Sequence, residues 1–309
     1  MPSWNSLQII IDDHLDILLN RLKDETLIDG FNIPKIKDYY PCILTFFAFF
    51  SIIYLSLDPL FKKIWKNKYY LKLNGFKRTD WNSRVVAFIH ALIINAFCIS
   101  LIAKYGFPWN KTENDYNDKE VDLYYKAISI SLGYFMWDII YSVYYVKQGG
   151  IGFAIHGVCA FLIYIFTFRY HVLGHYAILF LNYEISTIFL NIYWILDKLN
   201  KTGSILQLVN AFLLLVAFFT VRIAFGTVSI FRLLYDLFFR SKICPIYLSL
   251  YFTINIIIMQ CLNYVWFYKM IKSVLKHFPG TSEPKSKPES KGKSPSKKTK
   301  GKKSTKKID

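Results

Sequence analysis

Long apolar segments alternate with short polar ones along most of this chain. Seven of these segments are long enough to cross a bilayer, which takes about 20 mainly apolar residues in a helix. They span residues 39–60, 85–105, 127–146, 151–170, 177–196, 209–234 and 246–270. Because lipid offers no water to the backbone, each segment is expected to be an α-helix. The pattern therefore predicts an all-α, polytopic membrane bundle of about seven transmembrane helices.

The predicted crossings divide the chain into four parts. In residues 1–38, Leu7, Ile11 and Leu18 recur at helical spacing, which is typical of an amphipathic helix lying against the membrane or the bundle. Residues 39–80 hold the first crossing and a polar loop, and residues 81–272 hold the other crossings. Residues 273–309 are rich in Lys, Ser, Pro and Gly, a composition that predicts a disordered tail.

Basic residues in the loop after the first crossing set the expected orientation. They are Lys62, Lys63, Lys66, Lys68, Lys72, Lys77 and Arg78. Loops rich in Lys and Arg stay on the cytosolic side of the membrane. The loop is therefore predicted to be cytosolic and the N-terminal amphipathic segment lumenal. With an odd number of crossings, the C-terminal tail returns to the cytosol.

Two short motifs indicate the cellular compartment in which a protein with this topology would lie. Asn110 begins an Asn-Lys-Thr sequon in a loop predicted to be lumenal, where N-glycosylation can occur. Lys306 and Lys307 stand fourth and third from the end of the chain, as in the dilysine signal that coat machinery reads on cytosolic tails. The alternative is that a Lys-rich tail ends in this way by accident. The motifs predict a multi-pass protein of the endoplasmic reticulum membrane.

Charge and cysteine content exclude some classes of function. The net charge of +17 is concentrated in the tail, since residues 279–309 contain 11 lysines. A basic tail beside a membrane is expected to meet anionic lipid head groups, or to stay solvated, rather than to bind nucleic acid. The five cysteines form no CxxC pair, so neither a disulfide framework nor a metal site is expected. No motif indicates a cofactor.

Polar side chains inside the apolar segments mark the region in which to look for function, because such groups are costly in lipid. Depths counted at about 1.5 Å per residue place four of them in one layer in the cytosolic half of the bundle. These are His90, Asp138, His156 and Asn191. Arg222 is expected near the middle of its helix, where it needs a carboxylate partner, either Glu184 or Asp138.

Two interpretations of this polar layer compete. In one, His156 is a general acid or base that Asp138 orients, because imidazole titrates near neutral pH. In the other, the polar groups only form hydrogen bonds that hold the helices together. Tyr134 and Tyr141 share a helical face with Asp138. They would line a polar-ended slot for a lipid, or pack as aromatic residues ordinarily do in membrane helices.

Several motifs occur in the order and spacing of a known family. They are Trp81-Asn82-Ser83-Arg84-Val85-Val86, His90-Ala91-Leu92, Gly133-Tyr134 with Asp138, Phe153-Ala154-Ile155-His156, Glu184-Ile185-Ser186-Thr187, Phe189-Leu190-Asn191 with Trp194, and Val221-Arg222-Ile223. On these residues the chain resembles the TLC-domain family, which includes translocation-associated membrane proteins, ceramide synthases and the neuronal ceroid-lipofuscinosis membrane protein. It looks closest to the small TLC-domain transmembrane proteins linked to lipid homeostasis.

The resemblance implies a six-helix TLC domain over residues 81–272, with one helix preceding it. It also implies a role in membrane lipid homeostasis, in which the bundle binds or handles a membrane lipid. The side chains expected to line the lipid cavity are His90, Tyr134, Asp138, Tyr141, His156 and Asn191. An ion pair between Glu184 and Arg222 is expected to brace that cavity.

Two alternatives stay open. One is a ceramide-synthase-like N-acyltransferase of sphingolipid synthesis, with acyl-CoA as co-substrate, His156 as base and Asp138 as its partner. Ceramide synthases carry paired histidines followed by acidic residues, whereas Gly157 follows His156 here and the acidic continuation is absent. A role without catalysis is therefore favoured. The other alternative is a cargo or translocon-associated factor that makes its contacts through the basic tail.

Overall fold

The computed structural model of the protein describes residue 12 and residues 34–64, 66–107, 117–167, 171–240 and 244–275. All regular structure in these ranges is helical. Three sequence-based predictions lie outside the described residues. These are the amphipathic helix before residue 34, the sequon at Asn110, and the tail with Lys306 and Lys307.

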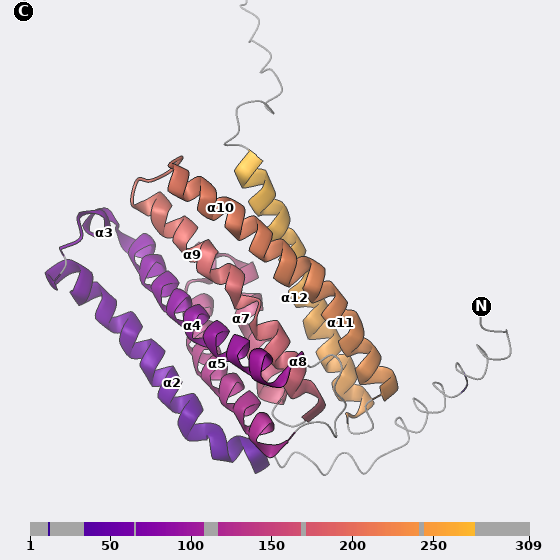
Figure 1. Ribbon diagram of the computed structural model, residues 1–309. Coiled ribbons are helices and arrows are strands. Elements are labelled where there is room, and N and C mark those ends of the chain that lie inside the picture. The colour runs from indigo at the N-terminus through magenta and orange to yellow at the C-terminus, as the bar shows by residue number, and fades with distance from the viewer. Residues whose placement is uncertain are drawn as a thin grey trace, which may run out of the picture.

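The described helices form long rods that run beside one another (Figure 1). They are α2 (Pro34–Pro59), η2 (Leu60–Ile64), α3 (Lys68–Lys72), α4 (Gly75–Tyr105), α5 (Asp118–Tyr144), α6 (Val146–Gly149), α7 (Ile151–Thr167), α8 (His171–Leu181), α9 (Glu184–Lys198), α10 (Ile205–Phe218), η5 (Phe219–Ala224), α11 (Phe225–Tyr235), η6 (Asp236–Arg240) and α12 (Ile246–Leu275). The η elements are π-helical turns that continue α2, α10 and α11. The predicted all-α membrane bundle is confirmed.

Five helical stretches within the described residues are long and apolar enough to cross a membrane. They are Asp38–Ile64, Gly75–Tyr105, Gly174–Lys198, Ile205–Arg240 and Ile246–Val274. The other two predicted crossings correspond to α5 and α7. Helix α7 is apolar but has only 17 residues. Helix α5 contacts α2, α4, α7 and α8, so side chains such as Ser129 and Ser131 point into protein rather than lipid.

Aromatic and aliphatic side chains of α2, α4 and α5 form the larger part of the core. His90 of α4 is fully buried there and lies flat on the ring of Tyr134, with ring centroids 4.0 Å apart. Its Nε2 is 3.3 Å from the hydroxyl of Ser131. Phe50 of α2 meets both rings edge-on. This core joins the first crossing to the helices that follow it.

The loop between α2 and α4 is held by side-chain hydrogen bonds. Asn67 caps the short helix α3 by accepting from the amides of Tyr69 and Tyr70. The hydroxyl of Tyr70 donates to Asp58 at 2.7 Å and lies 3.2 Å from the side-chain oxygen of Asn82. Burial, assisted by the bond to Asp58, raises the pKa of the Tyr70 phenol. The hydroxyl therefore stays protonated and links α2, α3 and α4.

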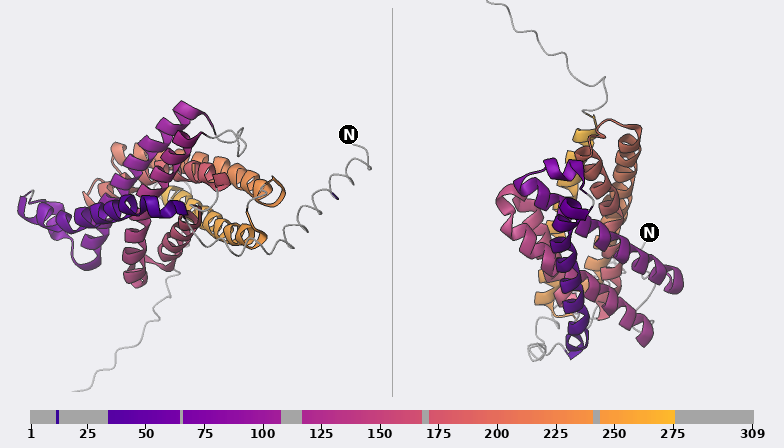
Figure 2. Two further views of the ribbon diagram at one scale, coloured as in Figure 1. Left: turned by 90° about the horizontal axis from the view of Figure 1, so that it is seen from below. Right: turned by 90° about the vertical axis from the view of Figure 1, so that its left-hand side faces the viewer.

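Helix α2 lies at one edge of the bundle (Figure 1, Figure 2) and packs against α5 along its length. The two backbones approach each other closely at Gly133. A Cβ atom there would lie 2.7 Å from the carbonyl oxygen of Ile43 and 2.7 Å from the amide nitrogen of Phe47. Neither backbone atom can move aside alone, so only glycine fits this crossing.

We predict that Gly133→Ala lowers the thermal unfolding midpoint of the protein in detergent micelles. The added methyl group must push α2 away from α5, and overpacking of this kind costs roughly 1–3 kcal/mol. Gly152→Ala in α7 is the matched control, because its Cβ would meet nothing nearer than 3.7 Å. Equal midpoints for the two variants would contradict the close crossing.

Candidate functional site

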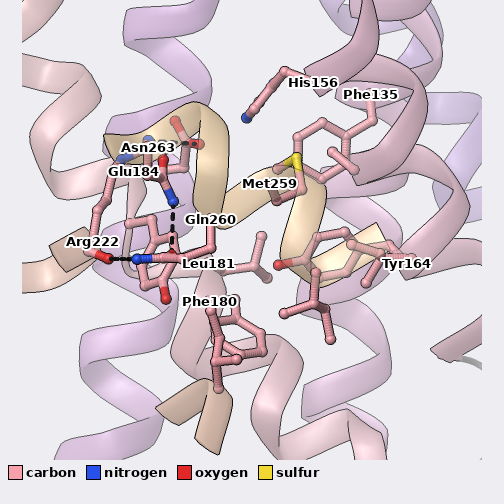
Figure 3. Close-up of a pocket in the computed structure, with 15 residues that line it drawn as sticks. Phe135, His156, Tyr164, Phe180, Leu181, Glu184, Arg222, Met259, Gln260 and Asn263 are labelled. Carbon is pink, nitrogen blue, oxygen red and sulfur yellow. Dashed lines mark hydrogen bonds and ion pairs between the residues drawn. The ribbon is translucent and has the colours of Figure 1, made fainter. Parts of the chain in front are cut away.

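A pocket opens between α7, α8, α9, α11 and α12, with Phe135 of α5 at its wall (Figure 3). The cavity itself has a volume of about 60 Å³, and it is partly open to the surroundings. The lining residues are Phe135, His156, Ala160, Ile163, Tyr164, Phe180, Leu181, Tyr183, Glu184, Arg222, Ile230, Ile256, Met259, Gln260 and Asn263. Polar side chains gather at one end of the pocket, and the rest of its wall is mostly apolar.

Arg222 is the central polar group of the pocket. It sits on η5, the six-residue π-helical stretch between α10 and α11, and is only 6% exposed. Its Nε donates to the hydroxyl of Ser186 at 2.8 Å and its Nη2 to that of Thr187 at 3.1 Å. Its Nη1 donates to Oδ1 of Asn263 at 3.3 Å. Side chains of α9 and α12 therefore hold the guanidinium from two sides.

The π-helical turn is itself braced by α12. A widened turn breaks the regular i to i+4 bonding and changes which backbone groups are available to side chains. Gln260 uses its Nε2 to donate to the backbone carbonyl of Arg222 at 3.1 Å. Its Oε1 accepts from Nδ2 of Asn263 at 3.3 Å, so the two amides and the guanidinium form one network (Figure 3). Helix α12 thus fixes both the backbone and the side chain of Arg222.

Glu184 lies beside Arg222 but does not contact it tightly. Its Oε1 is 3.7 Å from Nη2 of Arg222, within ion-pair distance but beyond a hydrogen bond. The carboxylate lies in the first turn of α9, where the positive end of the helix dipole favours a negative charge. Among the described residues no hydrogen bond donor reaches this buried carboxylate. Its oxygens can therefore accept bonds from a further polar group.

His156 lines the same pocket from α7. Figure 3 shows its imidazole pointing into the pocket, and its ring lies 5.5 Å from that of Trp266. No hydrogen bond to its nitrogens is formed by the residues that the structure describes. Both nitrogens are therefore available to a ligand that enters this space.

Asp138 reaches the contact between α5 and α7 without lining the pocket. A Cβ atom added at Gly157 would lie 3.0 Å from Oδ2 of Asp138 and 3.2 Å from the hydroxyl of Ser142. The predicted pair therefore lies at one helix contact, because Gly157 directly follows His156. Within the described residues, however, no hydrogen bond joins the Asp138 carboxylate to the imidazole.

The other predicted cavity residues lie away from the pocket. His90 and Tyr134 stack on each other in the core. Tyr141 stacks on Trp137 at 5.6 Å, and Asn191 is only 2% exposed. None of the four lines the pocket. The single polar layer expected from helical depth is therefore divided between a packed core and an open site.

Helix α12 supplies site residues that the sequence analysis did not single out. Met259, Gln260 and Asn263 all line the pocket. Gln260 and Asn263 are three residues apart and hence share a helical face. Polar residues at that spacing inside an apolar segment could have identified Gln260 and Asn263 from the sequence. The same kind of observation drew attention to Asn191.

Comparison with known proteins agrees with this architecture. A family model described as the TLC domain matches residues 80–272. An uncharacterized TLC domain-containing protein of Schizosaccharomyces pombe is 32% identical over 259 residues, covering 82% of this chain and 84% of that protein. Topoisomerase I damage affected protein 4 of Saccharomyces cerevisiae is 28% identical, covering 76% of this chain and 84% of that protein.

A vertebrate relative extends the similarity. TLC domain-containing protein 4-B of Danio rerio is 26% identical, covering 76% of this chain and 88% of that protein. The family model alone spans well over half of the chain, and the helices that it covers form the walls of the pocket. The resemblance found in the sequence is thereby confirmed. The protein is a multi-pass membrane protein that belongs to the TLC-domain family.

Proposed function

We propose that this protein binds a membrane lipid in the pocket beside Arg222 and acts in membrane lipid homeostasis in the endoplasmic reticulum. The observation that carries the proposal is the incomplete bonding of the polar end. Within the described residues, the buried Glu184 makes only a 3.7 Å contact with Arg222, and His156 has no hydrogen-bond partner. Buried polar groups without partners are costly in a membrane protein. A ligand head group would remove that cost.

The rest of the pocket suits the apolar part of the same ligand. Phe135, Ile163, Phe180 and Ile256 contribute to its wall, and the rings of Phe135 and Tyr164 stack at 5.3 Å. Apolar walls combined with a few convergent polar groups are typical of sites for amphiphilic ligands. A water-soluble substrate would have no apolar part to pack against most of this wall.

The distribution of basic residues supports the proposed orientation. Helix α3, the turn between α9 and α10, and the end of α12 lie at the same end of the bundle (Figure 1). Lys68 and Lys72 lie on α3, Lys198 and Lys201 near the α9–α10 turn, and Lys272 near the end of α12. Basic residues favour the cytosolic side. The N-terminus would then be lumenal, and the tail would meet coat machinery and anionic lipid head groups in the cytosol.

A catalytic role is the second candidate, and the exposure of His156 to the pocket favours it. In an N-acyltransferase reaction His156 would take the proton of an amine as its nitrogen attacks the thioester of acyl-CoA. The amide bond would form, the thioester bond would break, and coenzyme A would leave as the thiol. The missing hydrogen bond to Asp138 weighs against this role, because an unoriented imidazole is a poorer base.

We predict that His156→Ala lowers the amount of lipid that copurifies with the full-length protein in mild detergent. Loss of one polar contact should reduce retention of the enriched lipid about tenfold. Quantification of extracted lipid per mole of protein, by mass spectrometry, measures this. Ile155→Ala is the control, because that side chain is 38% exposed and does not line the pocket.

The outcomes separate the two candidate functions. If His156→Ala and the wild type carry the same lipids in the same amounts, binding at this pocket is refuted. The catalytic role would be supported instead if the wild type forms an N-acyl product from acyl-CoA and a long-chain amine and His156→Gln does not. Under the main proposal no such product forms.

We predict that the double substitution Lys306→Ala and Lys307→Ala moves the protein from the endoplasmic reticulum to later membranes of the secretory pathway. Coat machinery would no longer read the tail. The control replaces Lys302 and Lys303 by alanine and so removes the same charge from the same segment. Fluorescence microscopy of tagged protein distinguishes them, and identical distributions would contradict a dilysine signal.

A further inference from the structure

A second pocket, here called the α2 groove, lies where α2 and α5 begin and α4 ends. It shares no lining residue with the pocket beside Arg222. Asp38, Asp122 and Lys126 are the charged residues of its wall, and Phe46, Phe97 and Ile130 are among the apolar ones. Because α2 precedes the matched TLC domain at residues 80–272, the groove exists only where α2 packs on that domain.

The charged side chains form a rim with both signs of charge. Asp122 accepts a hydrogen bond from the hydroxyl of Tyr39 at 2.6 Å and pairs with Lys126 at 2.7 Å. The side chains of Lys126 and Asp122 are about half exposed. Asp38 is exposed, and within the described residues its carboxylate has no ion pair. Of the side chains that the structure describes, the rim therefore holds one ammonium group and two carboxylates, and one of these carboxylates, that of Asp38, has no ion pair among them.

The apolar residues of the groove lie at one depth below this rim. Phe46 follows Asp38 by eight residues, Ile130 follows Asp122 by eight, and Phe97 precedes the end of α4 by eight. Eight residues of helix span about 12 Å. Each of the three neighbouring helices thus contributes one apolar residue at a depth of about 12 Å below the charged end of the bundle. A charged rim above an apolar floor matches the profile of a lipid that stands in one leaflet.

We propose that the α2 groove binds a zwitterionic glycerophospholipid from the leaflet on this side of the membrane. Its phosphate lies against Lys126 and its ammonium group against Asp38, with the ring of Tyr39 alongside. The upper part of an acyl chain lies between Phe46, Phe97 and Ile130. The proposal rests on the membrane topology of α2, α4 and α5 and does not depend on the function proposed for the other pocket.

The charge pattern of the rim favours this class of lipid over others. An anionic lipid would place its negative charge beside the two carboxylates, which would repel it. It would also bring no positive charge to Asp38. An uncharged lipid such as diacylglycerol would engage neither sign of charge. A head group that carries a phosphate and an ammonium group complements both Lys126 and Asp38. The nearby Tyr39 ring adds a cation–π contact to the ammonium group.

Cys42 provides a direct readout of occupancy because it is part of the groove wall. Of the other four cysteines only Cys261 is exposed. In a Cys261→Ser background, the rate of maleimide labelling of the full-length protein in mild detergent therefore reports access to Cys42. We expect added phosphatidylcholine to slow the labelling, and phosphatidylglycerol and diacylglycerol at the same concentration to leave it unchanged.

Substitutions in the rim test the charge contacts. Lys126→Gln should raise the phosphatidylcholine concentration for half-maximal protection about tenfold, as expected for one lost charge-assisted contact. Asp38→Asn should do the same, and because the side chain of Asp38 is exposed, its substitution is not expected to disturb folding. Lys119→Gln is the control, because Lys119 is exposed on the same helix but is not part of the groove.

The proposal is overturned if phosphatidylglycerol or diacylglycerol protects Cys42 as well as phosphatidylcholine does. It is also overturned if Asp38→Asn and Lys126→Gln are protected like the wild type.

Phosphatidylethanolamine distinguishes the two zwitterionic classes. Equal protection identifies the ammonium group as the feature recognised, and weaker protection identifies its methyl groups. His156→Ala should leave all these rates unchanged, so failure at one pocket is not mistaken for failure at the other.

Discussion

The buried guanidinium of Arg222 is the interaction on which the arrangement of the pocket depends. A charge inside a membrane bundle must be surrounded by partners from the protein, because lipid supplies none. Ser186 and Thr187 of α9 and Asn263 of α12 meet this requirement. To satisfy one side chain, two helices distant in sequence from each other must lie on either side of η5. The same arrangement leaves a space between them, and that space is the pocket.

The pocket differs from the core in how its polar groups are satisfied. In the core, His90 is enclosed by Tyr134, Phe50 and Ser131, which leaves no room for a ligand. In the pocket, the one polar contact that the described residues make with the Glu184 carboxylate is 3.7 Å long, and His156 points into the pocket. Similar residue types at similar depths therefore have their polar groups satisfied to different extents. Close packing makes the first group structural, and incomplete bonding makes the second group available for binding.

Much of the architecture followed from the sequence because membrane helices obey simple rules. Apolar length predicted the all-α bundle, and the family resemblance was confirmed over residues 80–272. The need of Arg222 for a carboxylate left Glu184 and Asp138 as candidates, and the structure places Glu184 beside it. Helical depth alone did not separate His90 from His156, since depth says nothing about the direction in which a side chain points around its helix.

The sequence by itself determined that the chain is an all-α membrane bundle of the TLC-domain family, because a backbone surrounded by lipid has no water to bond and must satisfy its hydrogen bonds within each helix. Only the tertiary structure decided which polar groups share a cavity. Successive residues of a helix point about 100° apart, so the rotation of each helix against its neighbours selects the face that lines a pocket. That rotation is set by contacts such as the close crossing at Gly133 and the bonds of Gln260 to η5, which join residues far apart in the chain.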